Sequence, residues 1–165
     1  MAHFIRSNYI AVILNNYLII KLSNQLMARI KLQLPEQFIF KTELTVRIAD
    51  INYGNHLSND VYLSYMHEAR MQFFAHFGYT EMNLAGASVI MGDTAIVFKK
   101  ECFYGDELTI EVTAADFGSR SFDLYYRFTK KVTNETACEA KTGMVCFDYN
   151  ERKTVEVPEE FKKLF

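Results

Sequence analysis

The segment 58–77 predicts a single helix that is apolar over most of its circumference. Ser58 or Asn59 can cap its start, and Gly78 lies where glycine commonly ends a helix. Six residues form an apolar stripe at helical spacing: Tyr62, Tyr65, Met66, Ala69, Phe73 and Phe77. Four more apolar residues fall outside that stripe: Val61, Leu63, Met71 and Phe74. A helix of this kind needs burial on most sides, so we expect the rest of the fold to enclose it.

Strand-like segments flank this helix in the sequence. Apolar and polar residues alternate over 37–49, and a loop rich in Asn and Gly follows before the helix. Four strands and a short final helix are predicted after it: 88–103, 107–117, 120–131, 136–148 and 158–164. We therefore expect an α+β fold in which a curved antiparallel sheet of about five strands wraps around one long central helix. Because such a sheet leaves an edge strand, which proteins usually pair or cover, we also expect edge-to-edge dimerisation.

Residues 1–26 differ from the rest of the chain. They contain Arg6 and Lys21 but no acidic residue, whereas the remainder holds sixteen basic and twenty acidic residues. The apolar stretch 9–22 is shorter than the roughly 20 residues that a membrane span needs, and no small-x-small cleavage site follows it. We expect 27–165 to form a single domain, and 1–26 to be a dispensable extension or a start-site artefact ahead of Met27. A weak membrane-surface or targeting segment is the alternative.

The composition excludes several classes of protein and of site. Half of the residues are hydrophobic, which is enough for a core and excludes general disorder. A formal charge of −2, without a basic stripe, argues against a nucleic-acid partner. An odd number of cysteines without a CxxC pair makes a poor disulfide framework or zinc site, and the four histidines are scattered. We expect Cys102, Cys138 and Cys146 to be core residues in a reducing, cytoplasmic compartment, and we expect no metal site.

Part of the sequence resembles the hotdog-fold thioesterases of the 4-hydroxybenzoyl-CoA and short-chain acyl-CoA type. The resemblance covers about 42–165 and rests on four segments: VRIADINYGNHLSNDVYLSYMHEAR (46–70), FYGDELTIEV (103–112), FGSRSFDLYYRF (117–128) and AKTGMVCFD (140–148). It implies the hotdog fold and a homodimer or dimer of dimers with active sites at the subunit interface. It further implies that the acyl chain lies beside the central helix, and that no cofactor is needed beyond the coenzyme A of the substrate.

The match to the family's catalytic loop is uneven. Asp50 occupies the first acid position, but the second, which is the catalytic Asp in many relatives, is Asn52 here. An amide cannot act as a base or nucleophile at neutral pH and can only orient water or substrate. Asn55 and His56 resemble the Asn/Gly-His part of the loop, and the amide N–H of Asn59 matches the position that donates to the oxyanion. The resemblance thus implies an intact scaffold in which the usual base is replaced.

Three residues are candidates for the group that activates water. His56 is the first, because an imidazole with an ordinary pKa of about 6.5 suits base work near neutrality. Asp50 and Glu68 follow, the latter because other branches of the superfamily use a helix carboxylate. Each has a structural alternative: His56 as a cap or a bond to the loop backbone, Asp50 as a turn-stabilising residue, and Glu68 as a solvated or ion-paired charge.

Basic residues near predicted strand ends are candidates for binding the phosphates of coenzyme A: Lys99, Lys100 and Arg120. Asn55 in the loop and Tyr62 on the helix complete the predicted substrate-binding set. Ordinary solvated surface charges are the alternative for the three basic residues.

The function expected from this resemblance is hydrolysis of an acyl-CoA or acyl carrier protein thioester. From charge and hydrophobicity we expect neither a nucleic-acid partner nor firm membrane association. Two alternatives remain. One is a hotdog dehydratase acting on 3-hydroxyacyl thioesters, with His56 and Glu68 working across a dimer. The other is a non-catalytic acyl-thioester binder, which the amide at Asn52 suggests.

Overall fold

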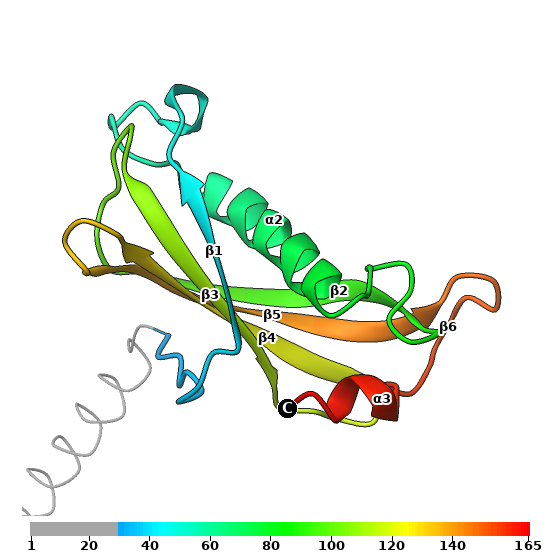
Figure 1. Cartoon of the computed structure of the whole chain (residues 1–165). Helices are drawn as coiled ribbons and strands as arrows, with labels where there is room; N and C mark the ends of the chain where they lie inside the picture. Colours follow the sequence, from blue (N-terminus) through cyan, green and yellow to red (C-terminus); the bar gives the residue numbers. More distant parts are fainter. Residues whose placement is uncertain (1–29) are drawn as a thin grey trace, which may run out of the picture. The chain divides into compact units, whose positions relative to one another are not determined.

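The computed structural model describes residues 30–165, of which 32–165 form one compact unit. The expectations for residues 1–26 lie outside the described residues. Within that unit one antiparallel sheet has the strand order β1-β3-β4-β5-β2 (Figure 1), and the short β6 pairs with β5. The strands are β1 (Phe40–Thr45), β2 (Ser88–Phe98), β3 (Glu107–Ala115), β4 (Ser121–Lys130), β5 (Thr136–Asp148) and β6 (Lys153–Thr154). The predicted α+β architecture of about five strands and one main helix is confirmed.

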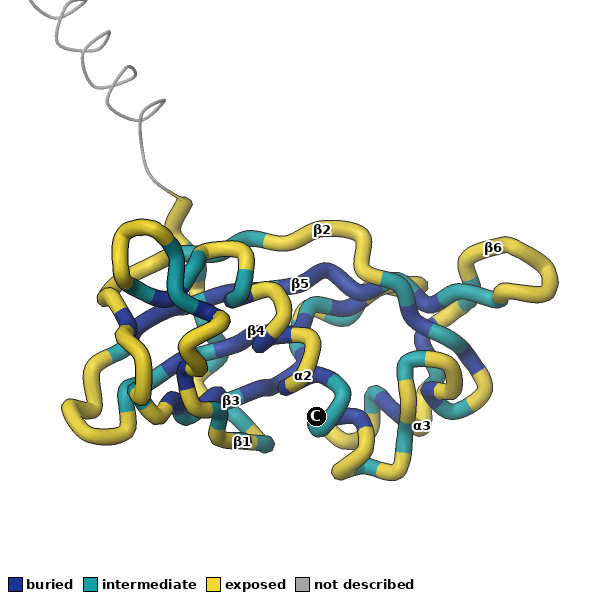
Figure 2. Tube along the Cα trace, turned by 90° about the horizontal axis from the view of Figure 1, so that it is seen from above, coloured by how far each residue is buried: buried dark blue, intermediate teal, exposed yellow. Residues whose placement is uncertain are grey.

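The main helix, α2 (Val61–His76), lies against one face of this sheet (Figure 1). Alternation along the strands supplies the facing surface: in β3, Leu108, Ile110 and Val112 are fully buried, whereas the intervening Thr109 and Glu111 are only partly buried. From the helix, fully buried side chains include Met66, Ala69, Phe73 and Phe74. Figure 2 shows buried residues concentrated along β3, β4 and β5, so the core lies between these strands and the helix.

The expectation that the sheet encloses most of α2 is wrong for the single chain. The sheet covers one side of the helix, and the other side is exposed. The exposed residues of the helix are Leu63, Ser64, His67, Glu68, Ala75 and His76. Leu63 alone among them is a large hydrophobic residue, 37% exposed. The apolar residues outside the predicted stripe therefore differ in burial: Phe74 is buried, whereas Leu63 is exposed.

Several element boundaries differ from those predicted. The alternation over 37–49 continues past the end of β1, but Ile48–Asp50 forms a short 3-10 turn because Asp50 caps the backbone N–H of Arg47. The helix begins at Val61 with Asp60 as its N-cap residue, so the predicted caps Ser58 and Asn59 are wrong. The final helix, α3 (Glu159–Lys162), is shorter than predicted, and β6 was not predicted.

Strand β2 forms one edge of the sheet and has a register shift between Met91 and Asp93. Its middle is exposed (Figure 2), and Met91 is 47% exposed. No partner strand lies on its outer side among residues 30–165. Dimerisation through a sheet edge stays a prediction.

The cysteines are buried and free, as predicted for core residues. Burial raises the pKa of Cys146 to about 11 and that of Cys138 to about 12, and it also raises the pKa of Cys102. All three are therefore neutral thiols near pH 7 and poor nucleophiles. Within the described part of the chain, no helix combines the length and apolar character required to cross a membrane.

Candidate active site

A buried carboxylate anchors the loop between β1 and α2. Asp50, 3% exposed, accepts hydrogen bonds from Arg47 Nε at 3.0 Å, from Arg47 Nη2 at 2.9 Å and from the Tyr65 hydroxyl at 2.6 Å. The Arg47 guanidinium is the main cause of a pKa lowered to about 2. Asp50 is therefore ionised and its oxygens are occupied, an arrangement that favours a positioning role for this residue over the removal of a proton.

The backbone of the loop folds back on itself so that His56 returns beside Asn52. The Asn52 N–H donates to the carbonyl of His56 at 2.9 Å, and Asn52 Oδ1 accepts from the Gly54 N–H at 2.8 Å. Asn55 adopts a positive φ of 63°, which asparagine tolerates better than most residues, and this closes the turn. At the end of the loop the Leu57 N–H donates to the carbonyl of Cys102 at 2.7 Å, which fastens the loop to the β2–β3 connection.

The His56 ring is held by three neighbours. Nδ1 lies 3.3 Å from the carbonyl of Leu57 and 3.4 Å from Asn52 Nδ2. A Cβ atom on Gly54 would lie 2.9 Å from His56 Nε2, so glycine is required for the ring to lie where it does. We assign a ring proton to Nδ1, which donates to the Leu57 carbonyl, the shorter of the two contacts and an acceptor with no other donor among residues 30–165. Asn52 Nδ2 is itself a donor, so with this tautomer it is a neighbour of Nδ1 and not its hydrogen-bond partner. The lone pair of Nε2 is then free to accept a proton.

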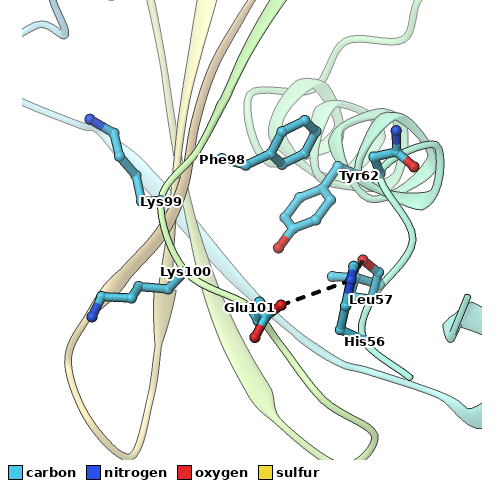
Figure 3. A pocket seen from close by; sticks show the side chains of 8 residues that line it. His56, Leu57, Tyr62, Phe98, Lys99, Lys100 and Glu101 are labelled. Atoms are coloured by element: carbon cyan, nitrogen blue, oxygen red, sulfur yellow. Dashed lines mark hydrogen bonds and ion pairs between the residues drawn. The ribbon is translucent and has the colours of Figure 1, made fainter. Parts of the chain in front are cut away.

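A cavity of about 450 Å³ opens beside His56 at the start of α2 (Figure 3). Its lining residues come from the loop, the helix and the end of β2: His56, Leu57, Asn59, Tyr62, Phe98, Lys99, Lys100 and Glu101. The rings of Tyr62 and Phe98 pack edge to face, with centroids 5.2 Å apart, and give the cavity an apolar wall. Burial raises the pKa of Tyr62, whose hydroxyl donates to Cys102 Sγ at 3.5 Å, so the phenol is neutral.

A residue just before the helix, Asn59, lines this cavity and has a backbone donor that is unpaired within the described part of the chain. No acceptor among residues 30–165 takes the backbone N–H of Asn59. Asn59 precedes the N-cap Asp60 by one residue, so its N–H lies next to the positive end of the helix dipole, where a developing negative charge is stabilised. The predicted oxyanion donor and the predicted base therefore line one cavity in the structure.

Not all of the predicted site residues meet there. Asn55 is exposed at the tip of the loop and does not line the cavity. Glu68 lines a separate cavity of about 520 Å³ and accepts a hydrogen bond from Gln72 Nε2 at 2.7 Å. Arg120 precedes β4 and donates to Thr154 of β6 at 3.1 Å, whereas Lys99 follows the C-terminal end of β2. Because β2 and β4 run in the same direction in this sheet, Arg120 and Lys99 lie at opposite ends of it.

Lys99 and Lys100 lie at the rim of the cavity, and Figure 3 shows their side chains pointing away from His56 and Tyr62. Each forms an ion pair, Lys99 with Glu139 at 2.9 Å and Lys100 with Glu135 at 3.0 Å. Both lysine side chains are about half exposed and can exchange these partners for an anionic ligand at small cost.

Sequence reasoning missed Glu101, which lines the cavity with Oε1 3.9 Å from His56 Nε2. Its only sequence signal was its place directly after two lysines at the end of a predicted strand. No group of three or more His, Cys, Asp and Glu side chains suited to a metal ion is found within the part of the chain described.

A sequence model of the thioesterase-like superfamily matches residues 46–165, which include the loop, the helix and every strand after it. The chain belongs to the thioesterase-like superfamily. No functionally curated protein matches this superfamily member.

Solved structures agree with the fold of this thioesterase-like chain. It is 20% identical to a 1,4-dihydroxy-2-naphthoyl-CoA thioesterase from Synechocystis, with a TM-score of 0.68 over 75% of this chain and 93% of that one. It is 17% identical to a DHNA-CoA thioesterase from Staphylococcus aureus, with a TM-score of 0.66 over 75% of this chain and 84% of that one. These likenesses confirm the predicted hotdog fold.

Proposed function

We propose that the chain hydrolyses a thioester of coenzyme A or of an acyl carrier protein to a free acid and a thiol. One observation carries the proposal: His56 and Asn59, whose backbone N–H has no acceptor among residues 30–165, line the same cavity. Hydrolysis of a thioester needs both kinds of group, a base for water and a donor for the carbonyl oxygen. Membership of the thioesterase-like superfamily and the names of the similar structures support it.

In this mechanism the thioester carbonyl oxygen accepts a hydrogen bond from the Asn59 N–H. His56 Nε2 removes a proton from a water molecule as the water oxygen bonds to the carbonyl carbon. The Leu57 carbonyl, which accepts from Nδ1 at 3.3 Å, stabilises the imidazolium that forms. When the C–S bond breaks, the imidazolium returns the proton to the departing sulfur, and the acid and the thiol leave.

The walls of the cavity suit the two ends of such a substrate. The apolar wall of Tyr62 and Phe98 can contact the acyl group, while Lys99 and Lys100 at the rim can bind phosphates. In this binding mode the coenzyme A part of the substrate lies at Lys99 and Lys100, and the thioester carbonyl lies near the start of α2.

A second function, acyl-thioester binding without turnover, is favoured by one specific observation: the loop carries an amide at Asn52, where its Nδ2 lies 3.4 Å from His56 Nδ1. The geometry gives less support to a dehydratase, because His56 and Glu68 line separate cavities in one chain and would have to meet across a subunit interface.

The test is thiol release from a panel of aliphatic and aromatic acyl-CoA substrates and an acyl carrier protein thioester, with binding measured in parallel by calorimetry. We expect at least one class of substrate to release thiol at a rate that saturates with substrate concentration. Saturable binding without thiol release would support the binder, and loss of water from 3-hydroxyacyl thioesters would support the dehydratase. Absence of both binding and turnover over the whole panel would contradict the proposed function.

A further inference from the structure

Two chain segments bring Glu101 and His56 together, and the backbone on each side is fixed. The Leu57 N–H, one residue after His56, donates to the carbonyl of Cys102, one residue after Glu101, at 2.7 Å. The carbonyl of Glu101 itself accepts from Lys130 Nζ at 3.3 Å. The carboxylate and the imidazole therefore face each other across the cavity because two anchored backbones place them there (Figure 3).

Glu101 differs from the other glutamates near the cavity in its partners. Glu135 and Glu139 pair with Lys100 and Lys99, whereas the carboxylate of Glu101 makes its one ion-pair contact in residues 30–165 with His56. The His56 ring thus has an amide, Asn52, beside Nδ1 and a carboxylate, Glu101, beside Nε2.

The separation of Glu101 Oε1 and His56 Nε2, 3.9 Å, is too long for a direct hydrogen bond. It does suit one water molecule that donates one hydrogen to Nε2 and the other to Oε1, each over roughly 2.8 Å. A water that donates both hydrogens directs its lone pairs away from these two acceptors, and both acceptors belong to residues that line the cavity. The carboxylate would also stabilise the positive charge that His56 gains as it takes the proton.

We propose that Glu101 is a catalytic carboxylate that, together with His56, holds and orients the attacking water, and so supplies from the β2–β3 connection the acid that the loop lacks at Asn52. This inference rests on the hydrolytic function proposed above. The water oxygen bonds to the carbonyl carbon, its first proton passes to His56 Nε2, and its second stays hydrogen-bonded to Glu101 until the C–S bond breaks. The imidazolium proton then goes to the sulfur, and the second hydrogen leaves with the carboxylic acid.

The first test compares the Glu101→Gln variant with the wild-type chain in steady-state thioester hydrolysis. The amide keeps the shape of the side chain but points either a donor or a weaker acceptor at the water, so we expect kcat to fall at least about tenfold while KM changes less than about threefold. Glu101→Asp, which keeps the charge, should recover part of the loss. Glu151→Gln is the matched control, because Glu151 has a similar exposure and a similarly long ion pair, with Lys153 at 3.7 Å, and does not line the cavity.

The second test separates activation of water from damage to the site. Hydroxylamine attacks a thioester carbonyl without first losing a proton to a base. With hydroxylamine as the acceptor, Glu101→Gln should form hydroxamate at a rate within about threefold of wild type, after subtraction of the uncatalysed reaction. Equal losses in hydrolysis and in hydroxamate formation would assign Glu101 to binding or structure and would overturn the inference.

The outcomes distinguish this inference from the proposed function. If wild type hydrolyses thioesters and Glu101→Gln keeps its kcat, the inference is wrong and the proposed function stands. If wild type releases no thiol from any substrate, the proposed function fails and the inference fails with it. Melting temperatures of wild type and all variants test whether unfolding causes any loss of activity. Because Glu101 is exposed, we expect these temperatures to agree within about two degrees.

Discussion

The hydroxyl of Tyr65 donates a 2.6 Å hydrogen bond to Oδ2 of Asp50, and this bond joins the main helix to the loop that carries His56. The same carboxylate receives the guanidinium of Arg47 from the end of β1. One buried Asp side chain therefore fixes the relative positions of strand, loop and helix. These contacts hold the loop that carries the candidate base, in addition to the neighbours of the His56 ring itself.

Replacement of Asp50 by Asn should lower the free energy of unfolding by about 1–2 kcal/mol at pH 7. The folded-state pKa of about 2 lies below the roughly 3.9 of an unfolded Asp, so the carboxylate stabilises the fold fully above about pH 4. That contribution is lost as the pH falls from 4 through 2. The difference in unfolding free energy between wild type and Asp50→Asn, measured with denaturant, should shrink over this range. A difference that stays constant down to pH 2 would contradict the stabilising role of the ionised Asp50. Tyr65→Phe removes one of the hydrogen bonds to Asp50 and should lower the free energy of unfolding by less than Asp50→Asn does.

Replacement of His56 by Ala should lower kcat by about 10²–10⁴-fold and leave acyl-CoA affinity nearly unchanged. A general base acts only in the transition state, so its loss appears in turnover and not in binding. The measurements are thiol release and calorimetric binding. His67→Ala is the control, because His67 is an exposed histidine on α2 outside the cavity. Near-native turnover of His56→Ala, together with inactive Asp50→Ala or Glu68→Ala, would move the base to one of those carboxylates.

Replacement of Asn52 by Asp should raise hydrolysis or at least preserve it. An Asp oxygen would replace the amide nitrogen that lies 3.4 Å from Nδ1, and it could accept from the Nδ1–H and stabilise the imidazolium. Asn52→Ala should lower turnover, though less than His56→Ala does, because it removes only an orienting group. We would measure kcat for both variants against pH. A loss of activity in Asn52→Asp as large as that in Asn52→Ala would show that the loop does not tolerate the family's usual acid.

Sequence patterns predicted most of the fold because each strand has its own local signal. The bounds of β5, Thr136–Asp148, agree with prediction because alternating residues lie between clear turn sequences. The 3-10 turn at Ile48–Asp50 could not be predicted in the same way. Alternation continues through Ile48, and only the capping of Arg47 by the Asp50 side chain ends the strand before it. A side-chain contact therefore overrides the pattern at the point where the site begins.

The candidate site was harder to predict than the fold because it combines residues distant in the chain. The loop residues His56 and Asn59 were found because they lie in one recognisable segment. Glu101 was missed because nothing near it in the sequence indicates that the Leu57–Cys102 hydrogen bond places it opposite His56. Arg120 was assigned to the site on chain position alone, and the sheet carries it to the opposite end.

Replacement of both Lys99 and Lys100 by Ala should raise KM for acyl-CoA substrates about three- to tenfold with little change in kcat. The rim ammonium groups can bind the phosphates of coenzyme A but lie away from His56. Acyl-N-acetylcysteamine thioesters, which carry no phosphate, should be unaffected, and higher salt should reduce the effect. Lys153→Ala serves as the control for an exposed lysine elsewhere. If Arg120→Ala also raised KM selectively for coenzyme A substrates, the residue would have to reach the cavity from a second subunit.

The chain should form a dimer or a larger homo-oligomer through the free edge of β2. This edge strand spans Ser88–Phe98 and is longer than the opposite edge strand, Phe40–Thr45, so it leaves more unpaired backbone donors and acceptors. Sedimentation velocity at micromolar concentration should show no stable monomer. Met91→Lys places a charge at the exposed middle of the edge and should weaken association, whereas Val132→Lys, at a turn where the valine is 90% exposed, should not. A folded monomer of the wild-type chain at micromolar concentration would contradict the prediction, and activity in that monomer would show that one chain holds a complete site.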